Sequence, residues 1–109
     1  MKIYTYTIYQ VRAKEDFAFM DWKRAKRFNW SFTPYKVEWV GIAKAKDDYE
    51  LLDRLFVKFN INHPLGFTGH SMSVSDIVKV HIKGDEDKDR YYYCDVRGWK
   101  DITEEVEGK

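Results

Sequence analysis

The chain has 109 residues, of which 44% are hydrophobic and 17% aromatic, and this length is typical of one domain around one core. Nineteen basic and 18 acidic residues leave a formal charge of +1, so no overall field attracts nucleic acid or an anionic membrane. The single cysteine, Cys94, excludes an internal disulfide, and the sequence shows neither a signal-peptide pattern nor the roughly 18 consecutive apolar residues of a membrane helix. We therefore expect a cytoplasmic protein without membrane attachment.

The first part of the chain predicts two strands separated by a helix. In residues 3–11 β-branched and aromatic side chains alternate, and the face that carries Tyr4, Tyr6 and Ile8 is the more apolar. Residues 13–28 have a helical pattern whose cations gather toward the C-terminal end, where the helix dipole favours them, and residues 29–34 end it. Residues 35–43 are then expected to form the second strand.

A second helix is expected to begin at Asp47. The run from Asp47 to Glu50 matches a capping box, in which each of the two carboxylates accepts a backbone hydrogen bond. Behind it, apolar residues at helical spacing predict a face that packs on the core. This predicted face consists of Tyr49, Leu52, Phe56 and Phe59.

The last part of the chain predicts a loop, a hairpin and a short final segment. The hairpin pairs a strand at 75–83 with one at 90–96 across an exposed charged turn, and a short segment follows at 99–102. Residues 103–109 are acidic and are expected to form a frayed tail. Residues 1–102 therefore predict a small single α+β domain in the order β-α-β-α-β-β, with a mainly antiparallel sheet packed by two helices.

One stretch combines cations with aromatic rings. Such a mixture can bind single-stranded nucleic acid, because cations pair with phosphates and rings stack on bases. It is equally typical of a solvated helix end whose aromatics seal the core, and the near-zero net charge favours this second interpretation. The candidate binding residues of the stretch are Lys23, Arg24, Lys26, Arg27 and Trp30.

A second motif holds the residue types of a hydrolase triad. His70 and Ser71 are adjacent, however, and adjacent side chains of an extended chain point in opposite directions, while no Gly-x-Ser-x-Gly elbow surrounds Ser71. We therefore interpret the motif as structural, shaping a turn into the next strand. The structural motif comprises Gly69, His70, Ser71, Ser73 and Asp76.

The sequence predicts no metal site and no cofactor. His63, His70 and His81 do not have the spacing of a compact metal motif, and no glycine-rich phosphate loop is present. Cys94 lies on a predicted strand between Tyr93 and Asp95, which favours an inert buried thiol. We expect no catalytic residues and hence no enzyme.

Five segments of the chain resemble the YodL-like domain family. They are Tyr9-Gln10, Phe59 to Pro64, Phe67 to Val78, Tyr91 to Asp95, and Gly98-Trp99. The resemblance covers most of the chain, excludes the basic run, and implies a bacterial protein of a phage or conjugative element. It implies no catalytic residue.

Together these observations predict a non-catalytic domain of a mobile genetic element that binds a protein partner through exposed aromatic residues. The alternative is a nucleic-acid-binding module that uses the stretch from Lys23 to Trp30. The exposure of four rings should separate these hypotheses: Phe28, Trp30, Trp39 and Trp99.

Overall fold

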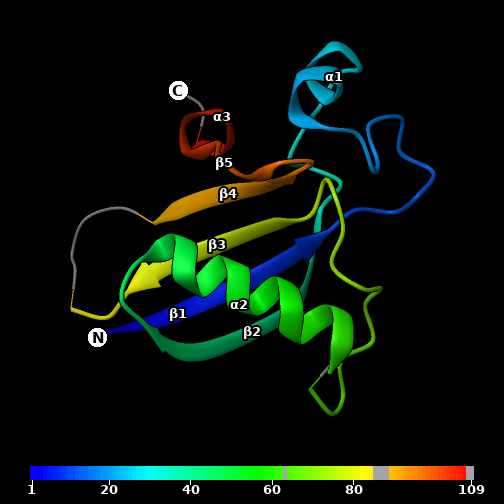
Figure 1. Ribbon diagram of the computed structural model, residues 1–109. Coiled ribbons are helices and arrows are strands. Elements are labelled where there is room, and N and C mark those ends of the chain that lie inside the picture. The colour runs from blue at the N-terminus through cyan, green and yellow to red at the C-terminus, as the bar shows by residue number, and fades with distance from the viewer. Residues whose placement is uncertain (63, 85–88, 108–109) are drawn as a thin grey trace.

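Five antiparallel strands form one sheet in the order β2-β1-β3-β4-β5, and the predicted α+β fold is confirmed (Figure 1). The computed structural model describes residues 1–62, 64–84 and 89–107. The strands are β1 Lys2–Gln10, β2 Lys36–Ala45, β3 Ile77–Ile82, β4 Arg90–Asp95 and β5 Gly98–Asp101. The helices are α1 Trp22–Arg27, α2 Asp48–Ile61 and α3 Thr103–Glu107. The predicted element order is thus extended by β5 and α3, while most of the predicted charged turn at 84–89 lies outside the described residues.

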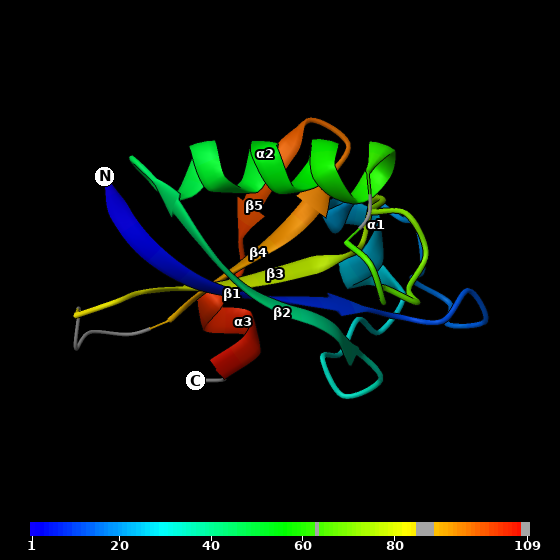
Figure 2. The ribbon, with the colours of Figure 1, turned by 90° about the horizontal axis from the view of Figure 1, so that it is seen from below.

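Helix α2 covers one face of the sheet, and the main core lies between them (Figure 2). Tyr4, Tyr6 and Ile8 of β1 point into this core, as the alternation of polar and apolar residues predicts. The apolar stripe of α2 that meets them consists of Leu51, Leu52, Leu55 and Phe59.

The predicted core face of α2 is wrong in two of its four residues. Tyr49 is 50% exposed and Phe56 39% exposed, because the stripe centred on the three leucines is the more apolar one and turns these two rings to its flank. The capping box forms with one change. The carboxylate of Asp47 accepts the Glu50 amide at 2.9 Å, and the Glu50 carboxylate accepts the amide of Lys46, at 2.7 Å, rather than that of Asp47.

Asp48 fastens the start of α2 to the sheet. Its carboxylate accepts hydrogen bonds from Nε and Nη2 of Arg90 at 2.5 and 2.9 Å, and from the hydroxyls of Tyr4 and Tyr92 at 2.7 and 2.6 Å. Burial opposes ionisation of Asp48, but the bonds from Arg90, Tyr92 and Tyr4 outweigh it and lower the pKa of the carboxyl to about 2. The four bonds therefore join one helix to two strands around a fixed negative charge.

The opposite face of the sheet has a second core, covered by residues 12–35 and α3. Trp22 packs edge-on against Tyr93 with ring centroids 5.0 Å apart, and Phe17 stacks on Tyr35 at 6.0 Å. Aromatic rings supply much of this core, since large rings bury a wide surface from few positions. Its buried residues are Val11, Phe17, Trp22, Ala25, Tyr35, Ile77, Tyr93 and Ile102.

The predicted helix over residues 13–28 is wrong for residues 13–21, nine of its 16 positions. Helix α1 spans only Trp22–Arg27, and the preceding residues form successive turns, each closed by a bond from an amide to the carbonyl three positions before it. Phe19 has φ of 65°, which interrupts any helix, and its amide donates to Ser75 Oγ at 2.9 Å. Tyr93 also donates its hydroxyl to the Met20 carbonyl, at 2.6 Å. These bonds to distant parts of the chain override the helical pattern.

Residues 103–107, part of the segment predicted as a featureless tail, form α3. Ile102 is fully buried, and Val106 packs against the second core. Thr103 Oγ1 accepts the amide of Tyr91 at 3.0 Å, which ties the helix to β4. Two apolar residues four apart are enough to anchor one turn of an otherwise acidic segment.

Cys94 is buried and free, as predicted. Burial raises the pKa of its thiol to about 12, so the thiol stays protonated and unreactive at neutral pH. None of the helices in the described part of the chain is long and apolar enough to cross a lipid bilayer.

Candidate functional site

The predicted structural motif surrounds a fully buried carboxyl group. Oδ2 of Asp76 accepts hydrogen bonds from Gln10 Nε2 at 3.0 Å and from the Ser73 amide at 2.9 Å. Oδ1 has no hydrogen-bond partner among the described residues and lies 3.9 Å from Nε2 of His70. Burial raises the pKa of Asp76 to about 7, against the opposing effects of the Ser73 amide, His70 and Gln10.

Gln10 holds the motif against the end of β1. Gln10 Nε2 donates to the His70 carbonyl at 2.8 Å, and Gln10 Oε1 accepts the His70 amide at 3.1 Å. The carboxamide therefore bonds to both the C=O and the N–H of His70. Gly69 leaves the space for this contact, because a Cβ there would lie 2.4 Å from Gln10 Oε1. These residues therefore fix the loop that leads into β3.

The ring of His70 is not arranged as in a hydrolase triad. Nδ1 lies 2.7 Å from the Ser71 carbonyl oxygen, which can only accept, so Nδ1 carries the hydrogen. Nε2 faces Asp76. A triad needs one ring nitrogen on a carboxylate and the other on the nucleophile hydroxyl, and in the described part of the chain no hydroxyl bonds to this ring. His63, the third histidine considered for a metal, lies outside the described residues.

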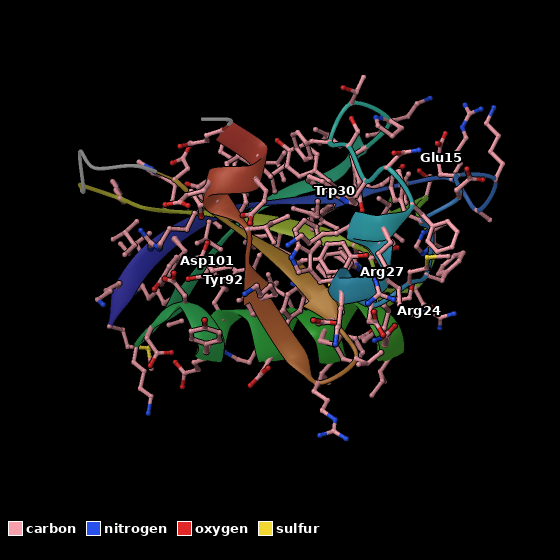
Figure 3. The ribbon with its side chains drawn as sticks, turned by 90° about the horizontal axis from the view of Figure 1, so that it is seen from above. Glu15, Arg24, Arg27, Trp30, Tyr92 and Asp101 are labelled. Atoms are coloured by element: carbon pink, nitrogen blue, oxygen red, sulfur yellow. The ribbon has the colours of Figure 1, made fainter. Side chains whose placement is uncertain are left out.

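Trp30 of the stretch around α1 is turned inward while the cations are exposed, although Lys26 Nζ lies over the Trp22 ring, 6.0 Å from its centroid. Trp30 packs edge-on against Trp22 at 4.9 Å and donates its indole N–H to the Tyr35 hydroxyl at 3.2 Å. The cations lie on the exposed side, and Figure 3 shows Arg24 and Arg27 on α1, with Trp30 between α1 and α3. The exposed cations are Lys23, Arg24, Lys26 and Arg27.

The four rings that sequence analysis singled out are mostly turned inward. Trp30, Trp39 and Trp99 are half-buried and pack against one of the two cores. Phe28 is exposed. Most of the other large exposed apolar residues lie elsewhere, along β2, the neighbouring end of β1, and the outer side of α2. On the sheet they are Ile3, Val37, Val40 and Ile42, and on α2 they are Tyr49, Phe56, Val57 and Ile61.

Strand β2 is an edge strand, so the N–H and C=O groups of successive residues point alternately toward β1 and away from the sheet. The Ile3 carbonyl accepts the Lys83 amide at 2.8 Å, so the N–H and C=O groups of Ile3 face β3. Lys44 is paired with Ile3 across β1 and β2, and its N–H and C=O groups therefore point away from β1. The guanidinium of Arg54 donates to the outward carbonyl of Lys44, and Glu50 accepts the amide of Lys46. Side chains of α2 therefore cap the C-terminal end of this edge.

The middle of the β2 edge has no such cap. Because outward and inward residues alternate, Val40 and Ile42 also present their N–H and C=O groups to the outside. Within the described residues nothing bonds to these groups, and the two side chains are 57% and 75% exposed. Natural edge strands are usually covered or shortened, so a long uncovered one is a place where another chain can pair.

A groove of about 610 Å³ runs between β2 and α2, beside this edge. Tyr6, Ala43, Leu51 and Leu55 line its apolar part. Tyr6 lies across β2 at Gly41, where a Cβ would be 2.4 Å from the Tyr6 hydroxyl oxygen. No local sequence pattern predicts this site, because the edge position of β2 and the place of α2 beside it depend on how the strands are ordered in the sheet.

Comparison with known proteins assigns the chain to a family. The model of the YodL-like domain matches residues 5–104, a range that includes the whole sheet except for three residues at the start of β1, together with all of α1 and α2. Neither the curated proteins nor the solved structures gave a match. Since the matched range covers nearly all of the sequence, the chain belongs to the YodL-like domain family.

Proposed function

We propose that the chain is a non-catalytic, cytoplasmic protein-interaction domain of a bacterial mobile genetic element, and that it binds an extended segment of a partner by strand addition along β2. The observation that carries this proposal is the uncapped backbone of Val40 and Ile42 beside the groove between β2 and α2. In strand addition, main-chain hydrogen bonds supply affinity and alternate side chains supply specificity.

The two sides of β2 suit the two faces of an added strand. Side chains that point toward α2 would enter the groove against Ala43 and Leu55, and those on the other face would cover Val40 and Ile42. The exposed apolar area at this edge then becomes buried, which is the usual source of affinity at a protein interface.

The nucleic-acid alternative has weaker support. Trp22 is buried and Trp30 is half-buried against it, which reduces the ring surface on which a base could stack. Glu105 of α3 lines the same hollow as Lys26 and Trp30 and adds a negative charge there. A catalytic role is likewise not proposed, since Nδ1 of His70 is bonded to the backbone and its Nε2 faces Asp76.

A library of linear peptides selected on the pure domain tests the proposal. We expect enriched peptides whose binding is lost in Ile42→Pro, because proline removes the outward N–H without removing a bond to β1. Leu65→Lys is the control, since Leu65 is 99% exposed in a loop. Circular dichroism establishes that both variants fold. Failure to enrich any peptide, or binding that survives the proline, would overturn the proposal.

A further inference from the structure

The charges around the β2 edge are mainly positive, although the chain as a whole is nearly neutral. Lys36 and Lys44 lie on β2, and Lys58 lines the groove together with Arg54. Lys36, Lys44 and Lys58 are exposed and form no ion pair in the part of the chain that the structure describes. These cations are available to a bound segment.

The acidic residues near the same edge are fewer and partly engaged. Glu50 lies 3.7 Å from Arg54 and also accepts the Lys46 amide, so its charge is already shared. Glu38 on β2 and Asp53 on the groove wall remain. The balance around the free backbone of Val40 and Ile42 is therefore positive.

We propose that the segment that adds to β2 is acidic, with carboxylates alternating with apolar residues over about five residues, a common strand length. This inference rests on the proposed function and names its ligand. Apolar side chains of such a segment would enter the groove against Leu51 and Leu55. Its carboxylates would then lie on the opposite face of the added strand, the side to which Lys44 points, and Lys58 adds positive charge at the groove wall. Complementary charge of this kind selects partners and speeds their association.

A second copy of the chain fits the edge less well. Pairing of β2 with β2 of another copy would bring two sets of Lys36, Lys44 and Lys46 to one interface, and lysine on an edge strand opposes such self-pairing. A nucleic acid would pair with the cations, but it has no peptide N–H and C=O groups to bond to the backbone of Val40 and Ile42. An acidic polypeptide uses both features at once.

Three peptides of equal length, in which valine alternates with Glu, Gln or Lys, provide the test by fluorescence anisotropy. We expect the Glu peptide to bind roughly fivefold or more tighter than the Gln peptide, as two or three exposed ion pairs allow, and to weaken as salt rises. The double variant Lys44→Glu, Lys58→Glu should reverse the preference toward the Lys peptide. The matched control Lys23→Glu, Arg27→Glu makes the same charge change on α1 and should leave the preference for the Glu peptide unaltered.

The outcomes separate the two proposals. If all three peptides bind equally and Ile42→Pro abolishes binding, strand addition stands and the acidic preference is wrong. If no peptide binds to the folded domain, both fail. The inference is also overturned if only the α1 variant loses binding of the Glu peptide, or if a single-stranded oligonucleotide binds more tightly than that peptide. A dimer in sedimentation that Ile42→Pro dissociates would overturn it as well, because the edge would then pair with a second copy.

Discussion

Two aspartates, the half-buried Asp48 and the fully buried Asp76, lie near the two ends of β1, and they differ in how their charge is satisfied. Asp48 accepts four hydrogen bonds, two of them from the guanidinium of Arg90. Asp76 is more deeply buried and has no bonded cation, and one of its oxygens has no partner within the described residues. The pKa of Asp48 is lowered to about 2, whereas burial raises that of Asp76 to about 7. Burial raises the pKa of both carboxyls, and only at Asp48 do the bonding partners outweigh it.

Removing the charge of Asp48 should have the largest effect on stability. In Asp48→Asn the Arg90 guanidinium loses the negative charge of Asp48, and the hydroxyls of Tyr4 and Tyr92 lose a strong acceptor. We expect the free energy of unfolding at pH 7 to fall by about 3 kcal/mol in urea titrations. The exposed Asp53→Asn on the same helix is the control and should change it by less than about 0.5 kcal/mol. A loss below about 1 kcal/mol for Asp48→Asn would contradict the role of this cluster.

Removing the charge of Asp76 should raise the free energy of unfolding at high pH, whereas removing that of Asp48 lowers it. The raised pKa means that the protonated carboxyl favours folding; this contribution is complete below about pH 4 and is lost as the pH rises through about 7. Asp76→Asn resembles the protonated form, so at pH 8.5 we expect it to be more stable than the wild type by about 1 to 2 kcal/mol. At pH 4.5 the two should differ little. Urea unfolding at both pH values measures this, and a variant that is less stable at pH 8.5 would refute it.

These two aspartates also mark the limit of what the sequence predicts. The apolar alternation of β1, the capping box at Asp47 and the hairpin of β3 with β4 are local patterns, and each is present in the structure. Asp48, in contrast, bonds to Arg90 across 42 positions, and Asp76 to Gln10 across 66. Nothing in a local window reports such a partner, so the Asp48 cluster was not foreseen.

Contacts between distant parts of the chain also determine the segment before α1 and the exposed edge of β2. Residues before α1 have a helical pattern, but bonds from Ser75 and Tyr93 to that segment replace it. The edge of β2 is visible only when the strand order is known, because the same alternating residues would be buried in a central strand. The candidate site is therefore a property of topology, and its residues have no motif of their own.

Lowering the pH of the wild type should remove the contribution of the ionised Asp48 to stability without a substitution. Its lowered pKa means that the ionised carboxylate stabilises the fold; this contribution is present above about pH 4 and is lost as the pH falls toward about 2. The gap in unfolding free energy between the wild type and Asp48→Asn should therefore shrink by roughly 1 to 2 kcal/mol between pH 6 and pH 2.5. A gap that stays constant over this range would show that the variant loses packing rather than charge.

The smallest expected effect belongs to His70, whose ring faces Asp76. Its Nε2 lies 3.9 Å from Oδ1, and the attraction lowers the pKa of Asp76, though less than burial raises it. His70→Ala should therefore move the titration of the Asp76 carboxyl, followed by its carbon-13 chemical shift, to higher pH. Because the ring is partly exposed, the free energy of unfolding should change by less than about 0.5 kcal/mol. A shift to lower pH would mean that His70 acts on Asp76 mainly by excluding water, and the contrast with Arg90 and Asp48 would then be one of solvation alone.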